Sequence, residues 1–180
     1  MGQVLLNGIS GMWHYTSTRE TNVDSLLELK PEIRAGVKYP DGSWKSERHF
    51  LDFVVNGESL WKIVGQARDM VSVLCSEYDL NETTKAVHRL LLREQADLPD
   101  NRRSLFICSE CGNLGCGTIT VVVAKHGGAI VWKNFGYENN YEDHVLLDEY
   151  GSIGPFTFNA VEYERTLLDG LTRVTGEPKS

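Results

Sequence analysis

The sequence lacks the features that mark membrane proteins and exported proteins. It contains no run of about 18 apolar residues, the length that a helix needs to cross a bilayer. Residues 1–8 show no basic leader, sustained apolar stretch or small-residue cleavage site, so we expect no secretory signal. We therefore predict a cytoplasmic protein that does not bind a membrane.

Motifs of the common enzyme classes are also missing. No Gly-x-Gly-x-x-Gly opens a helix after a predicted strand, and no phosphate-binding loop ends in Gly-Lys-Ser or Gly-Lys-Thr. Neither His-Glu-x-x-His nor Gly-x-Ser-x-Gly is present, and the 5 histidines are scattered along the chain. We accordingly predict no enzyme activity, no catalytic residue and no cofactor.

Basic residues are fewer than acidic ones. The chain has 18 Lys and Arg against 25 Asp and Glu, which gives a formal net charge of −7. Basic side chains that neutralise phosphates drive most binding to nucleic acid, so we expect no direct binding to nucleic acid. An acidic protein is compatible with a basic protein partner. Nothing in the sequence indicates an oligomeric state.

The length and composition indicate one globular domain. The chain has 180 residues, 41% hydrophobic and 24% charged, which is ordinary for a protein that buries a core without disulfides. Internal repeats and Pro-rich or Ser-rich linkers are missing. We predict a single domain over residues 1–174, followed by a flexible tail over residues 175–180.

Local patterns predict a mixture of strands and helices. Asn56-Gly57 predicts a tight hairpin turn, because a type I′ turn needs positive φ at both central residues. Helical spacing covers residues 81–95 and 160–171, and Asn159 is placed to cap the second helix. We expect an α+β fold in which a mainly antiparallel sheet is covered by a few helices. Strand-forming residues occupy 11–18, 50–55, 104–108, 118–124, 130–135 and 154–158, and residues 22–29 and 59–64 fit a strand or a helix.

Three of the 4 cysteines lie in one glycine-rich segment, residues 108–117. A Cys-x-x-Cys pair followed by Gly suits zinc, because thiolates bind zinc tetrahedrally and the glycine lets backbone amides turn towards sulfur. A fourth ligand is needed, and none stands at a familiar distance. Cys75 and His126 are the candidates, but a second Cys-x-x-Cys is missing, which weakens the zinc interpretation.

A redox dithiol and a structural bend are the alternatives for the same segment. Reactive Cys-x-x-Cys pairs precede a helix that stabilises the thiolate, whereas a β-prone run follows here. Cysteine is also often buried as a small hydrophobe, and glycines permit a tight bend between strands. We predict a structural strand-to-strand bend in the core, without a bound metal, formed by Cys108, Cys111, Gly112, Gly115, Cys116 and Gly117.

An acidic stretch with several tyrosines follows at residues 137–150 and contains no Lys or Arg. Tyrosine supplies rigid contact area in interfaces, and carboxylates attract a basic partner during association. A solvated acidic loop is the alternative interpretation. We predict that a protein partner binds through Tyr137, Glu138, Tyr141, Glu142, Asp143, Asp148 and Glu149.

The second half of the chain resembles a family of small bacterial proteins. The resemblance rests on Asp97-Leu-Pro-Asp100, the Cys-x-Glu-Cys-Gly-x-x-Gly-Cys-Gly core at residues 108–117, Tyr137-Glu-Asn-Asn-Tyr141 and Gly154-Pro-Phe-x-Phe158. Some proteins of this appearance look like immunity proteins of contact-dependent growth inhibition or related polymorphic toxin systems.

The resemblance implies that the chain binds and neutralises a cognate toxin domain, a nuclease of basic charge, by stoichiometric blocking. This implication agrees with the acidic composition and with the missing catalytic motifs. The alternative is a small zinc-binding or thiol oxidoreductase protein that uses Cys108, Cys111 and Cys116.

Overall fold

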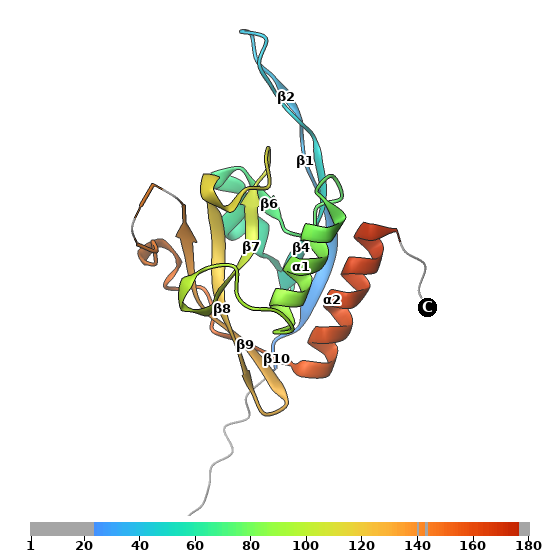
Figure 1. The fold of residues 1–180 in the computed structure, drawn as a ribbon, viewed down its shortest axis with the longest axis vertical. Helices are drawn as coiled ribbons and strands as arrows, with labels where there is room; N and C mark the ends of the chain where they lie inside the picture. The colour runs from blue at the N-terminus through green and yellow to red at the C-terminus, as the bar shows by residue number, and fades with distance from the viewer. Residues whose placement is uncertain (1–23, 140, 143, 177–180) are drawn as a thin grey trace, which may run out of the picture.

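The computed structural model describes residues 24–139, 141–142 and 144–176 of the chain (Figure 1). The predicted strand over residues 11–18 and the last residues of the predicted tail lie outside this part. Two antiparallel sheets and two α-helices form a body, and a long hairpin projects from it (Figure 1). The predicted α+β fold with mainly antiparallel sheets is confirmed.

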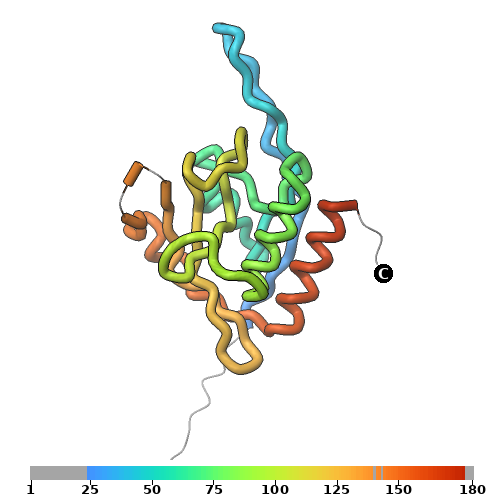
Figure 2. The backbone as a smooth tube through the Cα atoms, viewed as in Figure 1, coloured from blue at the N-terminus to red at the C-terminus, as the bar shows by residue number. Residues whose placement is uncertain are grey.

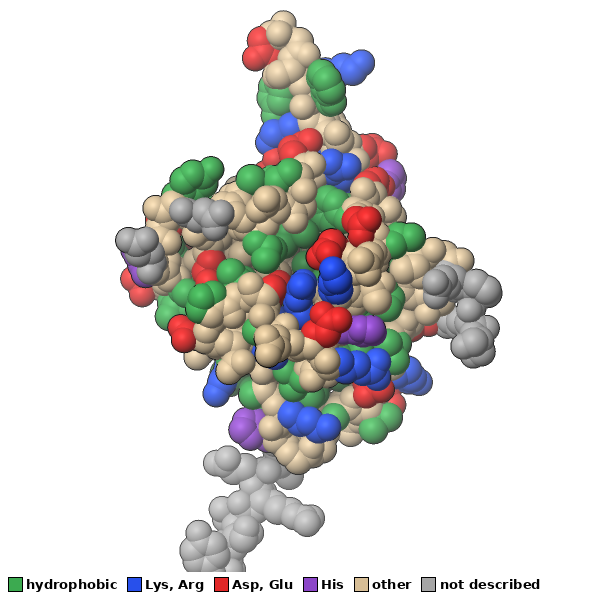
Figure 3. All heavy atoms as spheres, viewed as in Figure 1, with side chains coloured by type: hydrophobic (Ala, Val, Ile, Leu, Met, Phe, Trp, Pro, Cys, Tyr) green, Lys and Arg blue, Asp and Glu red, His purple; other side chains and the backbone are tan. Residues whose placement is uncertain are grey.

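The projecting hairpin belongs to a three-stranded sheet. β1 (Leu27–Arg34) pairs with β4 (Arg48–Val55) along the whole length of both strands. β2 (Val37–Lys38) and β3 (Trp44–Lys45) continue the hairpin to its tip, while β5 (Glu58–Ser59) pairs with the other end of β4. Figure 3 shows hydrophobic side chains on this hairpin, where the Trp44 side chain is 70% exposed.

The second sheet has five strands in the order β10-β9-β8-β7-β6, and every neighbouring pair is antiparallel. Successive hairpins make β7 to β9 neighbours in both sequence and space. The strands are β6 (Met70–Ser72), β7 (Arg102–Cys108), β8 (Thr118–His126), β9 (Ala129–Glu138) and β10 (Phe156–Asn159).

Backbone hydrogen bonds join the three-stranded sheet to the five-stranded sheet near both edge strands of the latter, β6 and β10. The Leu51 N–H of β4 donates to the Leu74 carbonyl, which follows β6, at 3.0 Å. The Ser25 N–H, which precedes β1, donates to the Thr157 carbonyl of β10 at 2.5 Å. The strands therefore curl around one shared core instead of forming two separate layers.

Two α-helices lie side by side against the sheets (Figures 1 and 2). α1 (Leu80–Leu90) is capped by Asp79, and α2 (Ala160–Thr175) by Asn159, which accepts from two amides of the first turn. No helix in the described residues is long and apolar enough to span a bilayer. Five single turns complete the fold: η1 (Trp61–Gly65), η2 (Gln66–Arg68), η3 (Pro99–Asn101), η4 (Leu114–Cys116) and η5 (Asp148–Tyr150).

Trp132 of β9 lies at the centre of the core. Its ring meets those of Phe53 and Phe158 edge to face, with centroids 5.6 Å and 5.2 Å apart. Its indole N–H donates to the Tyr163 hydroxyl at 3.0 Å, and that hydroxyl donates to the Leu90 carbonyl at 3.0 Å. Both sheets and both helices thus meet at one buried aromatic cluster whose polar atoms are satisfied.

Several local predictions are confirmed. Asn56 and Gly57 both have positive φ, at 52° and 86°, and connect β4 to β5 as the hairpin turn requires. The side chain of Asn159 accepts from the amides of Val161 and Glu162 and begins α2. Residues 22–29 and 59–64 fit either a strand or a helix in the sequence. In the structure, residues 27–29 are part of β1 and residues 61–65 form the helical turn η1.

Two details of the helices differ from the sequence prediction. α1 ends at Leu90 rather than at residue 95, because Leu92 takes a positive φ of 59° that breaks the helix. The helical spacing over residues 160–171 also predicts that Val161 packs inward, but its side chain is 74% exposed. Tyr163 and Leu167 provide the buried positions of α2 instead.

The two faces of α2 give a matched stability test. Leu167→Ala removes a fully buried side chain from the shared core, and we expect it to lower the free energy of unfolding by about 2–5 kcal/mol. Val161→Ala on the exposed face should change it by less than about 0.5 kcal/mol. Urea denaturation followed by tryptophan fluorescence measures both, and equal losses would contradict the assigned faces of α2.

Candidate functional site

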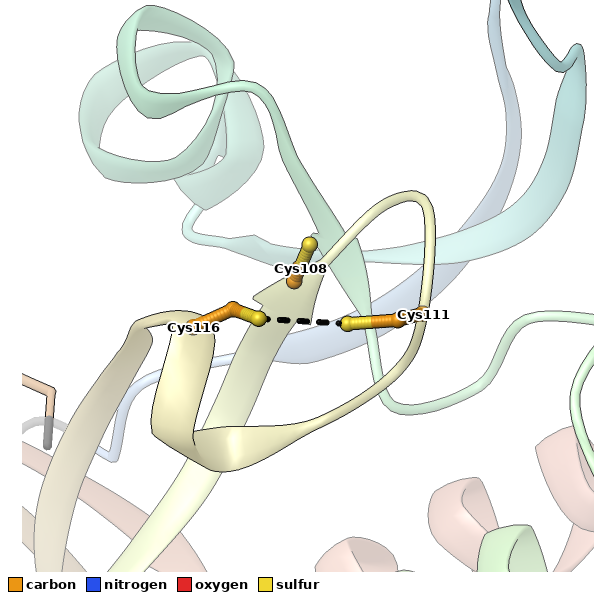
Figure 4. Close-up of side chains that lie close together, drawn as sticks. All are labelled: Cys108, Cys111 and Cys116. Carbon is orange, nitrogen blue, oxygen red and sulfur yellow. Dashed lines mark hydrogen bonds between the residues drawn. The ribbon is translucent and has the colours of Figure 1, made fainter.

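The three clustered cysteines lie in the connection between β7 and β8, residues 108–117, which we call the cysteine loop. Cys108 is the last residue of β7 and Cys116 the last of η4, and Ile107 pairs with Thr118 where the strands meet. The predicted strand-to-strand bend is therefore confirmed. The three Sγ atoms lie within 4.8 Å of one another, and those of Cys111 and Cys116 are 3.4 Å apart (Figure 4).

Short-range hydrogen bonds shape the cysteine loop. Gly112 has a φ of 65°, and its N–H donates to the Cys108 carbonyl at 3.0 Å, so the chain reverses directly after the first two cysteines. The Asn113 side chain accepts from the Gly115 N–H at 2.7 Å and starts η4. The Asn113 N–H donates to the Cys111 sulfur at 3.4 Å, which fixes the direction of that thiol.

Gly117 directly precedes the first residue of β8, and its φ is 134°. A Cβ at this position would lie 2.6 Å from the hydroxyl oxygen of Tyr137 and 3.0 Å from the terminal methyl of Met70. Any larger residue would push the loop away from β9 and β6. The close approach therefore explains why glycine stands directly after Cys116.

The expectation that the cysteines pack in the core is wrong for two of them. Cys108 is half-buried, but Cys111 and Cys116 are exposed, because the loop lies on the rim of the sheet beyond the last strand residues. Tyr78 supports the loop from below. Its hydroxyl donates to the Cys108 carbonyl at 2.6 Å, and its ring lies under Gly112. Burial is the main cause that raises the pKa of the Tyr78 hydroxyl.

Two arginines of the projecting hairpin hold the cysteine loop in place. Arg48 donates to the carbonyls of Ser109 and Glu110 at 2.6 Å and 2.9 Å. Arg34 pairs with the Glu110 carboxylate at 2.9 Å. Glu110 stands between the first two cysteines in the sequence, and its negative charge is balanced by Arg34.

Asp69 fixes Arg34 from the other side. Arg34 donates Nε and Nη2 to the two Asp69 carboxylate oxygens, both at 2.7 Å, and Nη1 to the Ser46 carbonyl at 2.6 Å. Lys45 also pairs with Asp69. Burial would raise the pKa of Asp69, but the hydrogen bonds from Arg34 and Lys45 lower it overall, so the carboxylate stays charged.

Neither predicted candidate for a fourth ligand joins the cluster, which among the described residues consists of three cysteines. Cys75 is fully buried, and its thiol donates to the Glu77 carboxylate at 3.1 Å. Burial, together with this hydrogen bond, raises the pKa of Cys75 to about 12. His126 ends β8, at the opposite end of that strand from the cysteine loop.

Basic residues from distant segments neutralise part of the acidic stretch. The Arg68 guanidinium lies 4.1 Å from the centroid of the Tyr137 ring. It also donates to the Tyr150 hydroxyl and pairs with the Glu149 carboxylate, each at 2.7 Å. Tyr137, Glu149 and Tyr150 therefore hold the stretch against the body of the protein.

Glu138 also serves the interior. Its side chain is 12% exposed and accepts from Arg102 and from the Thr120 hydroxyl, each at 2.6 Å. It is therefore a poorer partner contact than the sequence predicts. The other predicted contacts differ in position: Tyr141, Glu142 and Asp148 are exposed, Tyr141 at 84%, while Asp143 lies outside the described residues.

The sequence analysis missed the arginines that organise both regions. Arg34 and Glu110 are 76 residues apart, and Arg68 and Glu149 are 81 apart. No local motif signals such pairs, because they form only after the strands are placed. Arg34, Arg48 and Arg102 lie at the ends of β1, β4 and β7, outside the strand segments predicted from the sequence, so no sequence signal marked them.

The surroundings of the four cysteines predict their order of alkylation. In the native protein treated with a chelator, we expect iodoacetamide at mildly alkaline pH to modify the exposed Cys111 and Cys116 first. Cys75 should react only on unfolding, because burial both shields the sulfur and raises its pKa. Peptide mass spectrometry over a time course measures each rate, and rapid native labelling of Cys75 would contradict its position in the core.

Comparison of the chain with known protein-family models, curated proteins and solved structures finds no match. The family resemblance predicted from the residues therefore stays a prediction.

Proposed function

We propose that the chain binds a soft divalent metal ion, most simply Zn²⁺, through the thiolates of Cys108, Cys111 and Cys116. The observation that carries this proposal is the convergence of the three sulfurs within 4.8 Å. A tetrahedral zinc with Zn–S bonds of about 2.3 Å needs sulfurs roughly 3.8 Å apart. The 3.4 Å between the Cys111 and Cys116 sulfurs and the 4.8 Å limit on the other two separations lie on either side of that spacing.

The surroundings of the sulfurs favour metal binding over a chance grouping of three thiols. The Asn113 N–H already points at the Cys111 sulfur, as the outer hydrogen bonds of metal sites do. Tyr78 and Arg48 fix the backbone carbonyls of the loop. A loop held in this way loses little conformational freedom when a metal binds, which favours affinity.

Three protein ligands leave the fourth position of a tetrahedral zinc for a ligand from elsewhere, such as water or a group of a partner molecule. Cys111 and Cys116 are exposed, so this position is within reach of solvent. The proposed site therefore differs from a closed four-cysteine site that only stabilises a fold.

Thiol oxidoreductase activity is the competing use of the same residues. The Cys111 and Cys116 sulfurs are 3.4 Å apart, and a disulfide requires about 2.05 Å, so oxidation needs only a small movement. However, only the single turn η4 and then β8 follow the first pair, and no α-helix N-terminus stabilises a thiolate there. A reducing cytoplasm, which we expect for this chain, keeps the thiols available to metal.

Metal analysis tests the proposal. Protein purified under reducing conditions without chelator should carry one zinc per chain, and Cys116→Ser should lose this stoichiometric zinc because two thiolates hold it weakly. Cys75→Ser is the matched control and should retain the metal, because Cys75 lies outside the cluster. Substoichiometric zinc in the fully reduced wild type, or equal loss in both variants, would rule the site out.

A second candidate function is that of an immunity protein that blocks a cognate toxin domain. The exposure of Tyr141, Glu142 and Asp148 favours it, because an exposed aromatic side chain flanked by carboxylates suits a basic protein surface. The net charge of −7 and the family resemblance point the same way. This function would not depend on the cysteines.

Charge reversal tests the second candidate against a toxin domain, which is sought as the product of a gene adjacent to the gene for this chain. Glu142→Lys combined with Asp148→Lys should slow association several-fold at low ionic strength, because steering by these carboxylates is lost. Glu58→Lys reverses an exposed carboxylate on β5 and serves as the control. Surface plasmon resonance measures the rates. Failure of the wild-type chain to rescue cells that express the toxin would exclude this function.

A further inference from the structure

A cavity of about 370 Å³ lies between α1, β7 and the cysteine loop, and we call it the α1 cavity. Its apolar walls come from Val73, Ala86, Ile107 and Leu114, and the Tyr78 ring closes one side. The volume and the apolar lining suit a small organic molecule rather than a macromolecule.

Two hydroxyls in the wall of the α1 cavity have no hydrogen-bond partner. They are Thr83 Oγ1 on α1 and Ser104 Oγ on β7, and they are the only such buried side-chain atoms among the described residues. Both residues line this one cavity, and both are almost fully buried. Buried hydroxyls are nearly always paired, so two unpaired ones beside the same cavity indicate a ligand.

A buried carboxylate lies beside these hydroxyls. The Asp97 side chain is 7% exposed, and its bonds are long: it accepts from the Ser104 N–H at 3.3 Å and lies 4.0 Å from the Arg89 guanidinium. A buried carboxylate normally has shorter, charge-assisted bonds. Asp97 can therefore accept a further strong donor.

The charges around the α1 cavity favour a cation. Asp79, Glu82 and Asp97 line it together with the guanidinium of Arg89, while Arg103, outside the lining, is close enough to Asp97 for their charges to interact. Asp79 caps α1, and Glu82 pairs with Lys85 at 2.7 Å, so Asp97 is the carboxylate left with the weakest bonds. A ligand carboxylate would meet this negative lining and be repelled.

We propose that the α1 cavity binds a small molecule with an apolar body and a primary ammonium group. The body contacts the aliphatic walls, and the ammonium donates to the Asp97 carboxylate. Its remaining protons match the hydroxyl oxygens of Thr83 and Ser104, which reach it by rotation about χ1. The cavity borders the three-sulfur centre at Cys111, but the proposed contacts use no thiol, so this ligand does not require a bound metal.

Isothermal titration calorimetry with matched probes tests the ligand class. Phenethylamine, tryptamine and cyclohexylmethylamine supply the ammonium on different bodies, while 2-phenylethanol and phenylacetate replace it with a neutral or a negative group. We expect the best amine to bind about tenfold more tightly than the alcohol or the acid. No binding by any amine at millimolar concentration, or equal binding of the acid, would overturn the proposal.

Variants locate the binding within the cavity. Asp97→Asn should weaken amine binding about tenfold, whereas Glu58→Gln, which neutralises an exposed carboxylate on β5, should not change it. Ala86→Leu fills the cavity without changing charge and should abolish binding. Cys116→Ser should bind the amine normally, which separates this proposal from the metal site.

An NMR measurement covers the case in which a variant fails to fold. On titration of phenethylamine into the wild-type chain, the amide signals of Thr83 and Ser104 should shift, and that of Tyr141 should not. An unchanged spectrum at Thr83 and Ser104, or wild-type affinity in folded Asp97→Asn, would show that the amine does not use this cavity.

Discussion

The nearly buried guanidinium of Arg34 joins three segments that the sequence keeps far apart. It bonds Asp69 at the junction of η2 and β6, the Ser46 carbonyl in the hairpin, and Glu110 in the cysteine loop. Its hydrogen bond to Asp69 is the largest cause that raises the pKa of Arg34, so the charge is permanent. Arg34 therefore balances the charge of Glu110 within the loop that carries the three cysteines. The projecting hairpin is thus tied to the cysteine loop and to Asp69 through one nearly buried side chain.

The proposed metal site and the α1 cavity share one wall. Tyr78 holds the Cys108 carbonyl through its hydroxyl, contacts Gly112 through its ring and lines the cavity. Cys111 lines the cavity as well. A ligand in the cavity therefore contacts the backbone support of the sulfurs. Tyr78 and Cys111 would carry any coupling between the two sites, because the side chain of each bonds the loop backbone and also lines the cavity.

Local signals in the sequence predict the elements of this fold but not their contacts. The turn at Asn56-Gly57 and the cap at Asn159 follow from a few neighbouring residues, and the structure contains both. The exposure of Cys111 and the burial of Glu138 depend on which strand ends meet, and on arginines contributed from elsewhere. Composition favours a buried cysteine and an exposed glutamate. At these two positions tertiary pairing overrides that preference, so single-sequence reasoning places both residues on the wrong side of the surface.

The pairing of β7 with β8 explains why the three cysteines come together. Because Ile107 and Thr118 are partners, the ten residues between them must fold back on themselves, which brings all three sulfurs together from one short segment. A fourth protein ligand would have to come from another element. One candidate from the sequence, Cys75, forms a backbone β-bridge with Phe50 inside the core. Its thiol donates a hydrogen bond to Glu77. A metal bound only by these three cysteines would thus have one coordination position left for a ligand from outside the cluster. The same loop would then both bind the metal and present it to that further ligand.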